Sequence, residues 1–423
     1  MSVSLPVHAT PVTPADQGAA RPSRPAVRWF IMRVAASLGG VLLACAALEA
    51  VLRCTWERDL APKTIKAFKM FSYHRYDAAG GWRPKPNVHV VHDFFNARFT
   101  TNSRGLRGSR EYAVPRLGGV RRVLVLGDSF AWGFGVEDHE VFTAVLERNM
   151  PDTEVINLGV TGYQLPLEFQ YLQEEGMRYE PDVVVIAICQ NDLGASPGGP
   201  FVARGVGDAR RQKDPSGTSG THLSRRLKRS LYRHSYLHAA CVDGVNANKT
   251  LTRAAVRLGL KEELAGFERL DINLHAAMLE YPREVQESVE RAKVDLLRFD
   301  SFLRKRGARL IIALIPSLQA VDRRALSRTL AYMRYAVTDF DLDKPYRMLE
   351  RYATAHGIVV CSPIQDFRRL HHDGNRLFLR HDLHFNALGH RTFADALEPL
   401  LRRALPELPV SFAGPASSAI PAL

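Results

Sequence analysis

From residue 122 onward, short apolar runs alternate with amphipathic stretches, and this alternation restricts the possible folds more than any other feature of the sequence. The runs have the length of strands, and the stretches between them repeat apolar residues at helical spacing. Strands that alternate with helices predict a parallel sheet with helices on both faces. The predicted strands are 123–126, 155–158, 183–188, 310–315 and 358–361, and the predicted helices are 141–149, 167–177, 284–306 and 346–356.

The interval between the third and fourth predicted strands is far longer than one crossover helix requires. We interpret residues 197–284 as an inserted cap. Within it, residues 204–233 are rich in arginine and lysine, and their only acidic residues are Asp208 and Asp214. The net charge of the chain is +13, which favours anionic partners without choosing among them. The basic stretch either faces solvent or anionic headgroups, or recognises an acidic glycan.

The N-terminal region contains an apolar segment, residues 29–52, which only Arg33 and Glu49 interrupt. Its uncharged centre, 34–48, is short for a spanning helix of about 20 residues, but flanking charges can reach the membrane surfaces. Arginines precede the segment, so the positive-inside rule places residues 1–28, a tail predicted to be disordered, in the cytoplasm. The segment is therefore predicted to be a single-pass signal anchor in the inner or plasma membrane.

Other interpretations of the segment stay open: a signal peptide cleaved near Cys45, lipoprotein processing at the same cysteine, or a buried core helix. Residues 53–118 are predicted to form an irregular collar with short strand-like pieces, and residues 409–423 a second disordered tail. Between them, residues 119–408 form the α/β domain that contains the cap. Five cysteines are spread singly, without a C-x-x-C pair, so a zinc knuckle is excluded.

Polar residues follow several of the predicted strands. The first strand runs into Gly127-Asp128-Ser129, with the serine just beyond its carboxyl end. This serine opens the next predicted helix, so it is either a helix cap or an exposed nucleophile. Gly159 follows the second strand, and Asn191 follows the third. In open α/β sheets ligands bind at the carboxyl edge, which predicts that these residues meet.

A loop after the fifth strand adds Asp382-Leu383-His384 to this edge. The ordered set of motifs resembles the SGNH/GDSL hydrolase family over roughly residues 120–405, in the branch that has an N-terminal membrane helix. The resemblance implies a flavodoxin-like sheet of strand order 2-1-3-4-5 and ester hydrolysis or acyl transfer. Cys189 stands where the family commonly has glycine, and the family's last motif is often Asp-x-x-His. The single residue between Asp382 and His384 is similar to that of polysaccharide O-acetyltransferase relatives.

The resemblance and the chemistry of acyl transfer assign the roles. Ser129 is the nucleophile, His384 is its base, and Asp382 orients the imidazole. The oxyanion hole consists of the N–H of Ser129, the N–H of Gly159 and the amide of Asn191. Asp373 is the reserve candidate for orienting His384. No cofactor is implied, and the histidines near the C-terminus lack a metal-site spacing such as H-E-x-x-H.

Together these features predict a membrane-anchored esterase whose catalytic domain is periplasmic or extracellular. Its expected substrate is an O-acyl group, acetyl first, on a glycan of the cell envelope or an exported glycan. Two alternatives remain: a glycan O-acetyltransferase that uses the same triad, and a catalytically idle glycan-binding protein of the same fold. Nucleic acid is not an expected partner, because no aromatic-interleaved platform accompanies the basic residues.

Overall fold

The structure is a computed structural model that describes residues 24–55, 73–77, 81–92, 97–195, 235–261, 270–331, 333–380 and 382–407. The chain divides into two units, Met1–Trp56 and Glu57–Leu423. The first unit contains one long helix, α1 (Arg24–Thr55). This helix begins inside the segment predicted as a tail, and Pro25 is compatible with its first turn. Most of the predicted tails and the basic stretch 204–233 lie outside the described residues.

The second unit is built on a five-stranded parallel sheet, in the order β6-β5-β7-β8-β9. Numbered along the domain, this is the order 2-1-3-4-5, so the flavodoxin-like arrangement is confirmed. The first strand is central and pairs on both sides: Val123 aligns with Val155 and with Val183. The bounds of the strands are β5 (Arg121–Gly127), β6 (Thr153–Asn157), β7 (Val183–Ile188), β8 (Arg309–Leu314) and β9 (Val359–Cys361).

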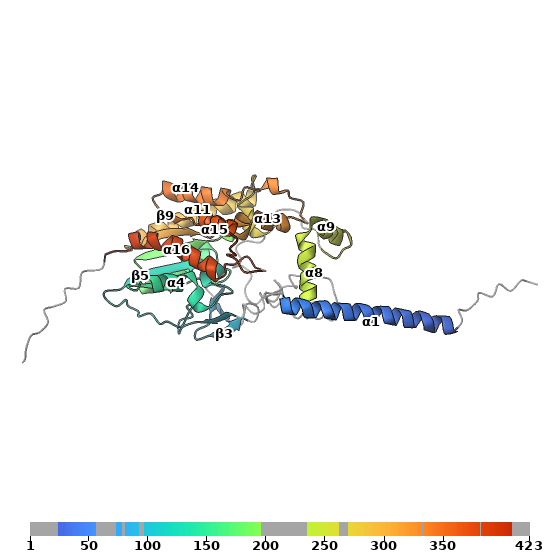
Figure 1. Cartoon of the computed structure of the whole chain (residues 1–423). Coiled ribbons are helices and arrows are strands. Elements are labelled where there is room, and N and C mark those ends of the chain that lie inside the picture. Colours follow the sequence, from blue (N-terminus) through green and yellow to red (C-terminus); the bar gives the residue numbers. More distant parts are fainter. Residues whose placement is uncertain are drawn as a thin grey trace, which may run out of the picture. The chain divides into compact units, whose positions relative to one another are not determined.

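Two layers of helices cover the sheet (Figure 1). In one, α4 packs on β6 and α16; in the other, α11 packs on β8 and α5. α11 places apolar residues at intervals of three and four, and this stripe, from Val285 to Leu303, is buried. The helices are α3 (Ser129–Trp132), η1 (Asp138–Glu140), α4 (Phe142–Asn149), α5 (Leu165–Glu174), η2 (Gly176–Tyr179), η3 (Gln190–Leu193), α8 (Tyr236–Ala247), α9 (Lys249–Arg257), α10 (Ile272–His275), α11 (Arg283–Arg304), α12 (Leu318–Val321), α13 (Arg323–Thr329), η6 (Val337–Asp339), α14 (Lys344–Ala355), α15 (Ile364–His372) and α16 (Ala387–Ala404).

The collar is more regular than its sequence indicated. It contains two antiparallel pairs, β1 (His74–Asp77) with β2 (Gly81–Pro84), and β3 (His89–His92) with β4 (Ala97–Thr100). A turn follows in which Asn102 Oδ1 accepts the N–H groups of Arg104 and Leu106. Gly105 adopts φ +83°, and a Cβ there would lie 2.6 Å from the Pro84 carbonyl oxygen, so only glycine suits this turn.

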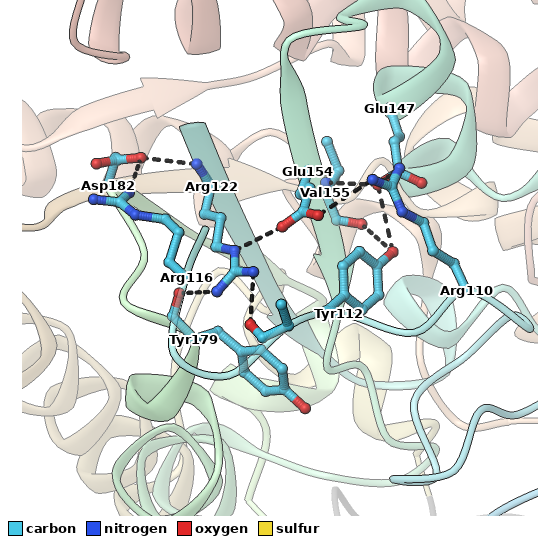
Figure 2. Close-up of polar contacts among 10 residues, drawn as sticks. Arg110, Tyr112, Arg116, Arg122, Glu147, Glu154, Val155, Tyr179 and Asp182 are labelled. Carbon is cyan, nitrogen blue, oxygen red and sulfur yellow. Dashed lines mark hydrogen bonds and ion pairs between the residues drawn. The ribbon is translucent and has the colours of Figure 1, made fainter. Parts of the chain in front are cut away.

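The end of the collar is attached to the amino edge of the sheet through Arg122 on β5, which is 1% exposed (Figure 2). Its Nε donates to Glu154 Oε2 at 2.7 Å, Nη1 to the Tyr179 carbonyl at 2.8 Å, and Nη2 to the Ala113 carbonyl at 2.7 Å. Its backbone N–H donates to Asp182 at 2.7 Å. Each guanidinium nitrogen therefore has a partner, as a buried charge requires.

Figure 2 also shows a second, more exposed part of this network, around Arg110. Its guanidinium lies 2.9 Å from Glu147 and 3.2 Å from Glu154. Tyr112 donates to both Glu147 Oε1 and the Val155 carbonyl, each at 3.4 Å. Residues of the collar thus bridge β5, β6 and α4, and they hold the two strands that lead to the catalytic edge.

Candidate active site

The sharp turn after β5 positions Ser129. Gly127 has φ +150°, and a Cβ there would meet the Ala131 Cβ at 2.8 Å, so the turn requires glycine. Asp128 caps α3 by accepting the Phe130 N–H at 2.9 Å. Ser129 is then the first residue of α3 and is 9% exposed. The cap of α3 is therefore Asp128 and not Ser129, and the serine hydroxyl is not used for capping.

The structure brings Ser129, His384 and Asp382 together. Ser129 Oγ lies 2.6 Å from His384 Nε2, although 255 positions separate them in the chain. On the other side of the ring, His384 Nδ1 hydrogen-bonds Asp382 Oδ1. The same carboxylate oxygen accepts the His384 backbone N–H at 3.0 Å. This carboxylate fixes the tautomer that carries a proton on Nδ1, so Nε2 is free to accept the serine proton.

Aromatic rings hold the imidazole in place. The ring of His384 lies 4.7 Å from that of Phe130 and 4.8 Å from that of Phe134, measured between centroids. These contacts and the Asp382 bond leave the ring little freedom to turn away from the serine. Asp373, the reserve candidate for orienting the base, is instead exposed at the end of α15 and caps that helix.

Gly159 has a different role from the one its motif indicated. Its N–H donates to Asn157 Oδ1 at 2.9 Å, and the Asn157 amide donates in turn to the Ala131 carbonyl at 2.7 Å. A Cβ on Gly159 would lie 2.5 Å from the Trp132 backbone nitrogen. The glycine therefore allows the loop after β6 to pack directly on α3. The N–H assigned to an oxyanion is already engaged by a side chain two residues away.

Asn191 lies at the carboxyl end of β7, in η3. Its Nδ2 donates to Asp128 Oδ2 at 2.8 Å, which leaves the second amide hydrogen for another acceptor. The backbone carbonyl oxygen of Asn191 accepts a hydrogen bond from Gln164 Nε2 at 3.0 Å, which joins η3 to the loop after β6. In that loop Gly162 is half-buried with φ +81°, and no hydrogen bond of its N–H occurs within the described residues. The second glycine of Gly159-Val160-Thr161-Gly162 was the signal that the sequence analysis missed.

Three buried carboxyl groups lie near one another, at Asp128 beside Ser129, at Glu168 on α5 and at Asp192 in η3. Burial raises the pKa of each, and the negative charge of Asp128 adds to the rise at the other two. The sequence analysis did not identify Glu168. Its position was nevertheless informative, because it lies three residues after Leu165 and four before Leu172, on the buried stripe of α5.

Two further predicted features have definite places. His390 lies on α16, as expected, and is buried with its Nδ1 3.4 Å from the Phe142 N–H. Burial, with Arg107 and His384 nearby, lowers the pKa of His390 to about 3, so it is neutral. In the other unit, the part of α1 from Arg28 to Thr55 is long and apolar enough to cross a membrane, a property that signal sequences share.

No protein-family model and no curated protein matches the chain. Among solved structures, a member of the lipolytic G-D-S-L family from Veillonella parvula matches at 11% identity and a TM-score of 0.35, over 67% of this chain and 100% of that chain. An acetyl xylan esterase matches at 14% identity and a TM-score of 0.35, over 66% and 99%. A catalytic mutant of an acetylxylan esterase from Geobacillus stearothermophilus matches at 14% identity and a TM-score of 0.34, over 68% and 95%. These similar structures are described as lipolytic G-D-S-L proteins and as acetyl xylan esterases, and the motif order of this chain resembles the same family.

Proposed function

We propose that this protein is a serine esterase that works through an acyl-enzyme on Ser129. The observation that carries the proposal is the 2.6 Å contact between Ser129 Oγ and His384 Nε2, with Asp382 on the opposite ring nitrogen. As Oγ attacks the acyl carbon, Nε2 takes the hydroxyl proton, and the imidazolium then gives it to the leaving alkoxide. A water molecule, deprotonated by the same nitrogen, cleaves the acyl-enzyme, releases the acid and restores the serine.

The negative oxygen of the tetrahedral intermediate requires donors on the side of the site away from the base. We assign this role to the Ser129 N–H and to the free amide hydrogen of Asn191, as the sequence predicted. Gly162 replaces Gly159 as the third donor in this proposal, since the Gly159 N–H is engaged by Asn157. Each such donor contributes about 3–4 kcal/mol in comparable sites.

A fluorophosphonate probe tests the nucleophile directly, because it reacts with an activated serine. Wild-type protein is expected to become labelled on Ser129, and Ser129→Ala to remain unlabelled while retaining its fold. Labelling of the alanine variant at the wild-type rate would refute Ser129 as the nucleophile. Absence of labelling in wild type would instead favour the idle glycan-binding protein, which has no activated serine.

The proposed substrate is an O-acyl group, acetyl first, on a glycan. This rests on the Asp382-Leu383-His384 spacing, which resembles that of polysaccharide O-acetyltransferase relatives. The same spacing supports a second candidate, in which a sugar hydroxyl replaces water as the acceptor. A transferase must hold this hydroxyl close and exclude water, which oriented binding achieves through a large effective molarity. Incubation with an activated acetyl ester and candidate oligosaccharides, read by mass spectrometry, separates acetate from acetylated sugar. Acetate as the sole product would leave only the esterase.

We also propose that the catalytic domain lies outside the cytoplasm, attached through α1. The arginines before the helix and its apolar length support this orientation. Fusions of reporters after residue 60 provide the test. A reporter that is active only in the periplasm or outside the cell should function there, and a cytoplasmic reporter should not. Activity of the cytoplasmic reporter would overturn the placement and the exported glycan with it.

A further inference from the structure

Glu168 is a buried acid without a partner. The residue is 1% exposed, and both of its carboxyl oxygens lack a hydrogen-bond partner. No ion pair of Glu168 occurs among the described residues. Helix α11, which packs on α5, buries only apolar side chains: Val285, Val289, Ala292, Leu296, Phe299 and Leu303. An ionised carboxylate in this position would have neither water nor a donor to stabilise it.

The three buried acids differ in the number of donors that they receive. Asp128 accepts two, the Phe130 N–H at 2.9 Å and Asn191 Nδ2 at 2.8 Å. Asp192 accepts one on Oδ2, the Cys189 N–H at 2.9 Å, while its Oδ1 is without a partner. Glu168 accepts none. Because hydrogen bonds to the charged form favour it, the negative charge belongs on Asp128 and a proton belongs on Glu168.

The electrostatic surroundings of the three acids also favour the charged form of Asp128 over those of Asp192 and Glu168. Burial and repulsion by Asp192 and Asp128 raise the pKa of Glu168 well above that of an ordinary glutamate. The pKa of Asp192 is raised in the same way, by burial and by the negative charge of Asp128. The neighbouring thiol of Cys189 also has a raised pKa and adds no charge. At Asp128, by contrast, the Phe130 N–H, the Asn191 amide and the charge of His384 oppose the effect of burial.

We propose that Glu168 is a positioning residue of the active site, which holds a proton at neutral pH so that Asp128 remains the anion beneath Asn191 and His384. The catalytic part of this inference rests on the proposed esterase function. Ionised Asp128 holds the Asn191 amide by a charge-assisted hydrogen bond. Its charge also favours the imidazolium that forms on His384 during acyl transfer. Ionisation of Glu168 would place a second negative charge nearby and drive Asp128 toward protonation, which would weaken both effects.

Equilibrium unfolding as a function of pH tests the proton without any assumption about activity. A carboxyl whose folded pKa is raised contributes stability that is fully present below its unfolded pKa, about 4.3, and is lost as the pH rises toward the folded value. Glu168→Gln has no such loss. Relative to wild type, its unfolding equilibrium constant should therefore fall as the pH rises from about 5 to 8, by up to about tenfold per pH unit.

The measurement follows the fluorescence of the buried Trp82 and Trp132 in the full chain in detergent. Glu284→Gln, which makes the same chemical change at an exposed position in the first turn of α11, is the matched control and should follow wild type. Parallel pH curves for wild type and Glu168→Gln would overturn the inference. So would a rise in melting temperature with calcium or magnesium chloride in wild type that Glu168→Gln lacks, since that would place a cation at this carboxylate.

The pH profile of kcat/KM tests the link to the active site. Wild type should lose activity on the alkaline side as Glu168 ionises, and Glu168→Gln should lack this alkaline fall. Glu168→Leu, which also keeps the site neutral, should share the pH profile of Glu168→Gln and lack the alkaline fall. An alkaline fall shared by Glu168→Gln would overturn the positioning role. Absence of ester cleavage in wild type would refute the proposed function, and the unfolding curves would still decide where the proton lies.

Discussion

Buried charged groups at the two ends of β5 differ in whether they have hydrogen-bond partners. At the amino end, Arg122 is enclosed by acceptors, and each nitrogen of its guanidinium has a bonded partner (Figure 2). At the carboxyl end, Asp128, Glu168 and Asp192 are buried as well, but the acceptor oxygens outnumber the available donors. The amino end of β5 therefore lies in a network in which every guanidinium nitrogen is hydrogen-bonded. Its carboxyl end lies beside acids that have carboxyl oxygens without a partner.

This difference indicates that the amino end of β5 serves the stability of the fold and that its carboxyl end serves the proposed chemistry. Buried polar groups in native proteins are nearly all hydrogen-bonded, and exceptions concentrate at functional sites. The Arg122 network meets that rule, and it joins the collar to the sheet. The acidic cluster departs from it, and its member Asp128 precedes Ser129 and accepts the Asn191 amide. Substitutions at the amino end should therefore change stability and leave turnover per folded molecule unchanged. Substitutions of Ser129 and His384 at the carboxyl end should change turnover and leave stability nearly unchanged.

The largest expected effect comes from the nucleophile and base at the carboxyl end. Ser129→Ala and His384→Ala should each lower kcat about 10⁶-fold, and the double variant should be little worse, because the two residues act as one unit. The melting temperature should change little. Ester hydrolysis and thermal unfolding of the full chain measure the two quantities. Additive losses in the double variant would show that the contact between Ser129 and His384 is not catalytic.

At the amino end, Arg122→Met should lower the free energy of unfolding by about 3–5 kcal/mol. The variant leaves the half-buried carboxylate of Glu154 without its Arg122 partner and leaves the buried Tyr179 carbonyl and the Ala113 carbonyl without their donors, which is the costly way to break such a network. Turnover per folded molecule should be retained, because the catalytic edge lies at the other end of the strand. Denaturant unfolding with active-site titration measures both. Wild-type stability with reduced kcat would reverse the assignment of the two ends.

The smallest effect is expected at Arg110, which shares Glu154 with Arg122. The Arg110 side chain is 51% exposed, so its ion pairs with Glu147 and Glu154 are screened by water. Arg110→Gln should lower the free energy of unfolding by less than about 1 kcal/mol. Measured beside Arg122→Met under the same conditions, it shows how much of that loss is due to burial. Equal losses in the two variants would mean that burial of Arg122 is not the cause.

Local patterns predicted much of this protein. The alternation of apolar runs and amphipathic stretches predicted β7 at 183–188, and it predicted the other four strands of the sheet to within two residues at each end. Because parallel strands present their carboxyl ends at one edge, the positions of Ser129 and His384 also predicted their meeting. The collar was harder to predict, because its two strand pairs are short and depend on turns such as the one at Gly105.

The sequence by itself determined where the strands lie and which polar residues follow them, since these come from periodicity and from residues at strand ends. The strand order and the proposed roles of Ser129, His384 and Asp382 came from the resemblance to the SGNH/GDSL family. Only the tertiary structure decided which donors are free and which acids are charged. The Gly159 N–H is engaged because Asn157 turns back toward it, and Glu168 has no donor because apolar residues of α11 pack over α5. The charge of a buried acid depends on which distant segments bring N–H groups to it, and no local pattern in the sequence records that.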